Sequence, residues 1–230
     1  DLSNAPDIRR DETDAWELGY KVVNRDIAEA VLRQIDGQHK PLVMLHDYHL
    51  YTCPGLIRAA RPDAFLQHSV HIPWSQPDSW RILPGGVREE IFRGLLANDI
   101  IGFHTSAYCR NFLACCRELM ELEVDYERGI VVQDGRETWV RAYPVAIDAN
   151  RLRQAAASEA VAAYEGEVLA RRRDYLIIRV DRADLSKNVL RGFTAFDAFL
   201  QQHPQFRERV TFVAHLQPSR QDVSEYVEYL

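Results

Sequence analysis

Short apolar segments alternate along the chain with longer segments in which apolar residues recur at helical spacing. Short apolar runs between turn signals are typical of strands, and a period of three to four residues is typical of amphipathic helices. Strands are predicted over residues 41–45, 64–70, 99–103, 175–180 and 210–214. Helices are predicted from Trp16 to near Gly37, over 54–60 and 87–96, up to Leu122, and over 156–172 and 190–200. This alternation favours a parallel, doubly wound α/β sheet over a sandwich or a helical bundle.

Three of the predicted strands end in polar residues that include histidine. The apolar run PLVML at 41–45 is followed by HDYH at 46–49, the strand at 64–70 by His71, and the strand at 99–103 by His104. Strands of a parallel sheet covered on both faces are continuously apolar, so residues 41–45 are expected to be buried on both faces. Ligands of open α/β sheets bind outside the carboxyl ends of the strands. The polar residues therefore mark the predicted functional edge of the sheet.

The pattern changes between residues 124 and 147. Residues 124–142 contain short β-prone segments, and Asp134-Gly135 is a hairpin signal between two of them. Further on, a helical segment rich in Ala and Glu leads into strand 175–180, which begins a new βαβ unit. We therefore place the domain boundary after residue 147, with domains over residues 1–147 and 148–230. The second has too few strands to close a sheet.

Composition narrows the class of protein. The chain has 230 residues, 47% hydrophobic and 27% charged, which is ordinary for a globular protein with a sizeable core. A net charge of -6 argues against nucleic acid and membrane surfaces as partners. No apolar run approaches a membrane span and the first residues lack the apolar core of a signal peptide, so a cytoplasmic protein is predicted. The 4 cysteines have no CxxC spacing and are interpreted as reduced core thiols.

Taken singly, the candidate residues have ordinary structural explanations. Asp47 could cap a helix, and His71 could be a hydrogen-bonded core histidine. Arg182 and Lys187 could form a solvated loop paired with Asp181 and Asp184.

Other polar and aromatic residues near the strand ends are given structural interpretations. His46 and His49 resemble a pair of metal ligands, but no third ligand lies at a suitable spacing, so no metal site is predicted. His104 is interpreted as structural. Trp74 and Trp80 are interpreted as wall and core residues, although one at the crevice could also contact a sugar.

Five motifs in order resemble the retaining glycosyltransferases typified by trehalose-6-phosphate synthase, glycosyltransferase family 20. They are HDYHL at 46–50, HIP at 71–73, RILP at 81–84, IGFHT at 101–105 and VDRADLSK at 180–187. Trp16, Tyr20 and Asn24 match the helix that precedes these motifs in the family, and PSR at 218–220 matches a later loop. The ordered set covers nearly the whole chain.

The resemblance implies a GT-B fold, in which two Rossmann-like, doubly wound domains face each other across a cleft. Residues 1–147 would be the acceptor domain without its first strand and glycine loop. Residues 148–230 would be the start of the nucleotide-sugar-binding domain. Both domains would be incomplete, and these 230 residues by themselves are expected not to catalyse the reaction.

The resemblance also implies metal-independent transfer of a glucosyl unit with retention, most simply from UDP-glucose to glucose 6-phosphate, with no cofactor. Asp47 would bind a hydroxyl of the acceptor sugar, and His71 would contact the donor sugar near the scissile bond. Arg182 and Lys187 would meet the charge on the leaving phosphate, aided by the amino end of the following helix. These four residues are expected to border one crevice. Nucleotide sugar and sugar phosphate are the expected partners, and a homo-oligomer is left open.

Several residues depart from the synthase pattern. Asn188 stands where Gly commonly follows the lysine, Trp74 where Phe is common, and Asp184-Leu185 where Asp-Tyr is usual. Together with Trp80 they also resemble the pseudo-glycosyltransferase branch, which couples a nucleotide-cyclitol to an amino-cyclitol phosphate. A non-catalytic relative that binds a sugar phosphate and regulates a partner is the remaining alternative.

Overall fold

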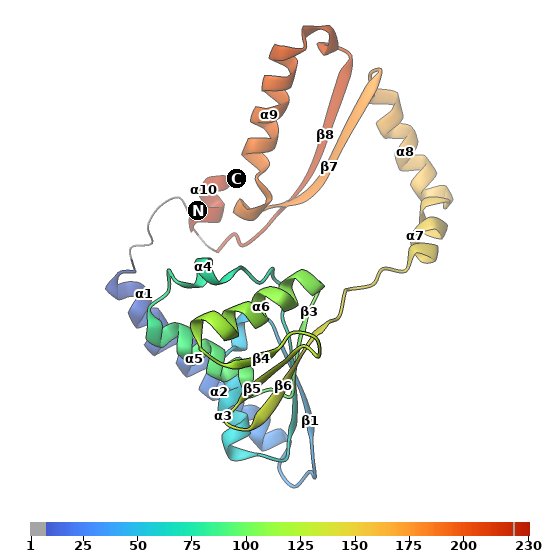
Figure 1. Ribbon diagram of the computed structural model, residues 1–230. Coiled ribbons are helices and arrows are strands. Elements are labelled where there is room, and N and C mark those ends of the chain that lie inside the picture. Colours follow the sequence, from blue (N-terminus) through green and yellow to red (C-terminus); the bar gives the residue numbers. More distant parts are fainter. Residues whose placement is uncertain (1–7, 223) are drawn as a thin grey trace. The chain divides into compact units, whose positions relative to one another are not determined.

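The computed structural model describes residues 8–222 and 224–230, and the chain forms two compact units, Asp1–Ala146 and Ile147–Leu230 (Figure 1). The division falls one residue before the boundary placed from the sequence. Each unit has its own sheet.

The sheet of the first unit has six strands. They are β1 (Leu42–His46), β2 (Phe65–Ser69), β3 (Ile100–Phe103), β4 (Glu123–Asp125), β5 (Ile130–Gln133) and β6 (Arg136–Ala142), in the order β1-β2-β3-β6-β5-β4. The first four in this order are parallel, whereas β5 and β4 run antiparallel to their neighbours. Asp134 and Gly135 both have positive φ between β5 and β6, which confirms the predicted hairpin. The antiparallel extension makes the sheet mixed.

The helices predicted in the first unit are present, and two short ones, Arg10–Asp14 and Pro77–Trp80, were not predicted. In chain order the helical segments are α1 (Arg10–Asp14), a π-helical segment (Ala15–Tyr20), α2 (Lys21–Gln34), a 3-10 turn (Tyr48–Leu50), α3 (Cys53–Ala60), α4 (Pro77–Trp80), α5 (Gly85–Leu96) and α6 (Ser106–Leu119). Thr105 caps α6 by accepting a hydrogen bond from the N–H of Tyr108 at 3.2 Å. The four cysteines are free and buried, as predicted.

The core of the first unit lies on one face of its sheet. Val43, Leu45 and Leu66 are buried against α2 and α3, whereas Ile101 and Val140 are buried against α5 and α6. Burial of these apolar side chains holds the helices in place.

The other face of the sheet stays open in the described residues. Leu42 is 65% exposed and Met44 is 51% exposed, and Phe65 and Trp139 on neighbouring strands are also exposed. The prediction that residues 41–45 are buried on both faces is therefore wrong. Among the described residues β1 is an edge strand, and its successive side chains alternate between a covered and an uncovered face.

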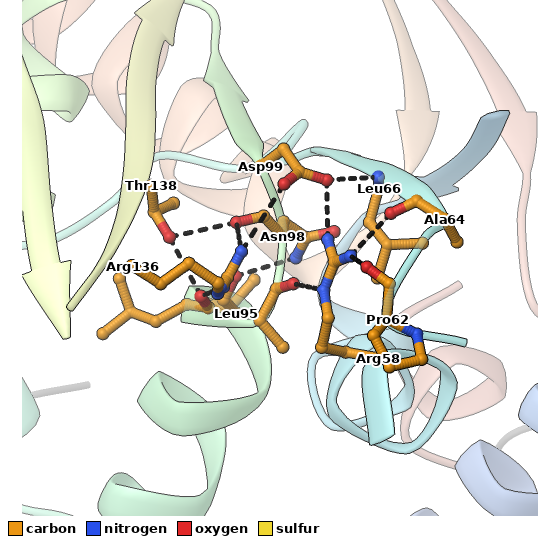
Figure 2. Close-up of polar contacts among 11 residues, drawn as sticks. Arg58, Pro62, Ala64, Leu66, Leu95, Asn98, Asp99, Arg136 and Thr138 are labelled. Atoms are coloured by element: carbon orange, nitrogen blue, oxygen red, sulfur yellow. Dashed lines mark hydrogen bonds and ion pairs between the residues drawn. The ribbon is translucent and has the colours of Figure 1, made fainter. Parts of the chain in front are cut away.

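A polar network ties together the amino ends of the strands (Figure 2). One oxygen of Asp99 accepts hydrogen bonds from Arg58 at 2.6 Å and from the N–H of Leu66 at 2.7 Å, and the other lies 3.6 Å from Arg136. Arg58 also donates hydrogen bonds to the backbone carbonyls of Pro62, Ala64 and Ala97. Arg136 and Thr138 each donate to the backbone carbonyls of Leu96 and Asn98. The network fixes strand register at the end of the sheet away from the polar clusters.

The second unit contains a parallel pair of strands, β7 (Tyr175–Ala183) and β8 (Val210–Pro218). Its helices are α7 (Ala149–Ala156), α8 (Glu159–Arg171), α9 (Val189–Gln202) and α10 (Ser224–Tyr229), with 3-10 turns at Leu185–Lys187 and Pro204–Phe206. The helix predicted over 156–172 corresponds to α8, whereas α7 was not predicted. Two helices form because Asp148 and Ser158 each cap a separate start, accepting from the N–H groups of Arg151 and Val161.

Candidate functional site

Three histidines meet at the carboxyl ends of neighbouring strands of the first unit. His46 ends β1, His71 lies two residues beyond β2, and His104 directly follows β3. Nδ1 of His46 is 3.1 Å from Nε2 of His71, and Nδ1 of His71 is 3.3 Å from Nε2 of His104. Oδ1 of Asp47 accepts the backbone N–H of His71 at 3.2 Å. The structure thus brings together two predicted site residues, Asp47 and His71.

Asp47 has a strained backbone. Its φ of 65° and ψ of 177° lie in a region that is populated essentially by glycine, at a cost of about 1–3 kcal/mol for other residues. Its N–H donates to the carbonyl of Ser69 at 2.8 Å, and its own carbonyl accepts from the N–H of Leu50 at 3.3 Å. The carboxylate does not cap the turn that follows. Surrounding hydrogen bonds therefore hold Asp47 in a conformation that it would not adopt alone.

His68 is a further residue of this site, and the sequence analysis did not single it out. It lies near the carboxyl end of β2, is fully buried, and places Nε2 2.9 Å from the carbonyl oxygen of Asp47. Because a carbonyl can only accept, Nε2 of His68 carries the hydrogen. Burial lowers the pKa of His68 to about 4, so the ring is neutral near pH 7. The sequence feature that could have identified His68 is a histidine within an otherwise apolar predicted strand.

His68 should make the stability of the first unit depend on pH. Its pKa rises from about 4 in the folded chain to about 6.5 when unfolded, so the unfolded state binds more protons between these values. Stability present above pH 6.5 should therefore be lost as the pH falls towards 4, by about 3 kcal/mol for this group. His46, Asp47 and His71 are the titratable neighbours. Denaturant unfolding followed by tryptophan fluorescence measures this, because all 4 Trp residues lie in the first unit.

His68→Gln is the matched control for that measurement. The glutamine amide can donate to the carbonyl of Asp47 but does not titrate. We expect the difference in unfolding free energy between the native chain and His68→Gln to shrink or reverse as the pH falls from 7 to 4. A difference that stays constant across this range would contradict the assignment.

Residues of the first helical segments hold the loop that follows Asp47. The hydroxyl of Tyr20 donates to the carbonyl of Tyr48 at 2.6 Å and accepts the N–H of Tyr51 at 2.9 Å, and burial raises its pKa to about 12. Asn24 is fully buried, donates to the carbonyl of His49 at 2.9 Å and accepts the N–H of Cys53 at 3.0 Å. Tyr20 and Asn24 are polar because their side chains bond the backbone of this loop.

The other residues interpreted from the sequence lie beside the site. Trp74 is 2% exposed and stacks on Trp80 with ring centroids 4.5 Å apart, which confirms its interpretation as a core residue. The ring of His49 stacks on that of Tyr48 with centroids 4.0 Å apart, and the ring of His46 instead contacts His71. Within residues 8–222 and 224–230, no group of three or more His, Cys, Asp or Glu is arranged to hold a metal ion.

The second unit carries the two predicted cations at the carboxyl end of β7. Arg182 is 53% exposed, and its Nη2 lies 3.5 Å from Oδ2 of the nearly buried Asp184. Asp184 accepts hydrogen bonds from the hydroxyl and the N–H of Ser186 at 2.8 and 2.9 Å, and these lower its pKa. Lys187 is exposed and ends the turn that follows. Asp184 therefore pairs with Arg182 while about half of the Arg182 side chain stays exposed.

Arg179 is a second residue that the sequence analysis missed. It pairs with Asp181 at 2.8 Å and donates to the backbone carbonyls of Lys187 and Asn188. Gly192 lies so close to this guanidinium that a Cβ would collide with it. Arg179 therefore fixes the backbone beside Lys187.

The amino end of α9 is already paired. The N–H groups of Val189 and Leu190 donate to the hydroxyl of Tyr229 at 2.8 and 3.3 Å. Two of the N–H groups that the sequence analysis expected to face the leaving phosphate are therefore already paired.

Comparison with protein families identifies the family of this chain. The model of glycosyltransferase family 20 matches residues 3–230, nearly the whole chain. The chain belongs to glycosyltransferase family 20. The family predicted from the five motifs is confirmed.

Relatives of this family 20 chain are longer than the chain itself. The UDP-forming α,α-trehalose-phosphate synthase of Emericella nidulans is 36% identical over 228 residues, which cover 96% of this chain and 43% of the relative. The corresponding synthase of Schizosaccharomyces pombe is 34% identical over 216 residues, covering 92% of this chain and 41% of the relative. The chain spans less than half the length of these relatives.

Solved structures of the family confirm the α/β, GT-B fold class. A UDP-forming synthase from Burkholderia vietnamiensis matches with a TM-score of 0.77 at 28% identity, over 96% of this chain and 47% of that chain. An E. coli structure bound with UDP-2-fluoro glucose matches with a TM-score of 0.80 at 24% identity, over 96% and 47%. A Burkholderia xenovorans synthase in complex with glucose-6-phosphate matches with a TM-score of 0.79 at 24% identity, over 96% and 48%.

None of the helices in the described residues has the length and apolar character needed to cross a bilayer.

Proposed function

We propose that the full-length protein containing this chain is a retaining glycosyltransferase that moves a glucosyl unit from UDP-glucose to glucose 6-phosphate, forming α,α-trehalose 6-phosphate. The observation that carries the proposal is the family match over residues 3–230, with 34–36% identity to UDP-forming synthases. The complexes of the E. coli and B. xenovorans neighbours, with UDP-2-fluoro glucose and glucose-6-phosphate, support both substrate classes.

In this proposal the first unit binds the acceptor and contacts the donor sugar. The carboxylate of Asp47 accepts a hydrogen bond from an acceptor hydroxyl, and the hydrogen bond from the N–H of His71 supports its position. His71 contacts the donor sugar near the scissile bond. A carboxylate bonded to a hydroxyl orients the acceptor without needing to act as a nucleophile.

The second unit stabilises the leaving group. As the glycosidic bond to the diphosphate breaks, negative charge grows on the leaving phosphate oxygen, which takes the proton of the attacking hydroxyl. Arg182 offers a planar fork to phosphate oxygens, and Lys187 offers a compact positive charge. Fixed cations of this kind lower the energy of the transition state without a metal ion, so neither a metal nor a cofactor is part of the proposal. Residues 1–147 would thus be the acceptor domain and residues 148–230 the beginning of the nucleotide-sugar domain.

Mass spectrometry of the full-length gene product tests this function. The protein is incubated with a small matrix of UDP-, GDP- and ADP-sugars against sugar phosphates, and a disaccharide phosphate is expected from UDP-glucose and glucose 6-phosphate. Coupling of a nucleotide-cyclitol to an amino-cyclitol phosphate instead would assign the protein to the pseudo-glycosyltransferases. Binding of a sugar phosphate with no transfer would assign it to regulatory relatives.

A further inference from the structure

The histidine row, defined as His46, His71 and His104, is only partly used by the proposed function, which needs His71 alone. The ring centroids of His46 and His71 are 5.3 Å apart with planes at 16°, and those of His71 and His104 are 5.2 Å apart at 49°. Both ring nitrogens of His71 lie within hydrogen-bond distance of a neighbouring imidazole. Each such contact needs one N–H and one lone pair, so the protonation of one ring constrains the next.

The direction in which hydrogen bonds are donated along the row follows from His104, whose Nδ1 is buried. Nδ1 of His104 is buried and has no hydrogen-bond partner in the described part of the chain. A buried N–H without an acceptor is rarer and costlier than an unpaired acceptor, so this nitrogen carries the lone pair and the hydrogen of His104 is on Nε2. That hydrogen is donated to Nδ1 of His71. His71 then carries its own hydrogen on Nε2 and donates it to Nδ1 of His46.

We propose that His104 and His46 are positioning residues, which hold His71 as its neutral Nε2–H tautomer with the hydrogen directed towards the exposed end of the row. The role in transfer rests on the proposed function, in which His71 contacts the donor sugar. The tautomer itself does not depend on that function. A wrong tautomer of an active-site histidine is known to impair catalysis even when the geometry is kept.

The alternative arrangement of hydrogens is disfavoured by the same buried nitrogen. If His71 carried its hydrogen on Nδ1, it would donate to Nε2 of His104, and His104 would have to carry its hydrogen on the buried, unpartnered Nδ1. His46 is exposed and is therefore free to exchange hydrogen bonds with solvent or substrate. The row thus has a fixed end at His104 and an adaptable end at His46.

A matched pair of substitutions at His104 tests the proposal. The side-chain amide of His104→Gln can donate to Nδ1 of His71 as the histidine does, whereas the carboxylate of the isosteric His104→Glu can only accept. Long-range proton–nitrogen NMR of the 230-residue chain with labelled histidines, at a pH above 8, reports which ring nitrogen of His71 carries hydrogen. His71→Gln identifies the resonances by their loss. We expect hydrogen on Nε2 alone in the native chain and in His104→Gln, and hydrogen on Nδ1 in His104→Glu.

The same pair is then assayed for glucosyl transfer in the full-length protein. We expect His104→Gln to keep kcat/KM within about threefold and His104→Glu to lose about tenfold or more, because only the second changes the tautomer. Hydrogen on Nδ1 of His71 in the native chain, or the same His71 tautomer in both variants, would refute the assignment of hydrogens along the row. Full activity of His104→Glu despite a changed tautomer would overturn the positioning role. If the native full-length protein transfers no sugar while the NMR pattern holds, the proposed function fails and the tautomer assignment stands.

Discussion

Arg182→Ala in the full-length protein is expected to lower turnover about 10²–10³-fold, the scale found when one preorganised electrostatic donor is removed from a transition state. Lys187→Ala should have an effect of the same order. Asp184 lies 3.5 Å from Arg182 and restrains its guanidinium before substrate binds. Initial rates with UDP-glucose and glucose 6-phosphate measure the loss.

Charge and geometry can be separated with conservative variants. Arg182→Lys keeps the positive charge but loses the planar fork, so it should recover only part of the rate. Arg153→Ala removes an exposed arginine of α7 and should leave the rate unchanged. Because the proposed chemistry uses side-chain cations, a chelator should not lower the native rate. Normal turnover of Arg182→Ala, or strong inhibition by a chelator, would refute the assigned role.

Asp47→Ala is expected to lower kcat/KM about tenfold to hundredfold, because a hydrogen bond to a charged carboxylate is worth about 1.5–3 kcal/mol. Asp47→Gly should lower it equally, since neither variant retains the carboxylate. The two variants should differ in stability. Glycine adopts a φ of 65° with a ψ of 177° without strain, whereas alanine does not. The glycine variant should therefore be more stable than the alanine variant by about 1–2 kcal/mol.

Denaturant unfolding of the 230-residue chain with tryptophan fluorescence compares these two variants directly. Both lose the hydrogen bond between Oδ1 of Asp47 and the N–H of His71, so that loss cancels in the comparison. An alanine variant at least as stable as the glycine variant would show that the backbone of Asp47 is not strained.

Local pattern was enough to predict the succession of strands and helices and the grouping of polar residues at strand ends. Hydrophobic periodicity and turn residues act over a few neighbouring positions, which is why the Asp134-Gly135 hairpin and the strand before His46 could be predicted. The ordered motifs were also enough to predict the family. Helix α7 was missed, although Asp148, which caps its start, is a local signal.

The tertiary structure decided which residues support the predicted ones. His68 meets Asp47 across 21 positions of sequence, and Asn24 meets Cys53 across 29. Such contacts depend on strand order and register, which no local pattern contains. The open face of β1 has the same origin, because burial of Leu42 and Met44 depends on which elements cover the edge strand. The sequence by itself determined most of the elements, the family and the residues at the strand ends. Only the fold determined the strain at Asp47 and the direction of the histidine row, because both arise where separate strands meet.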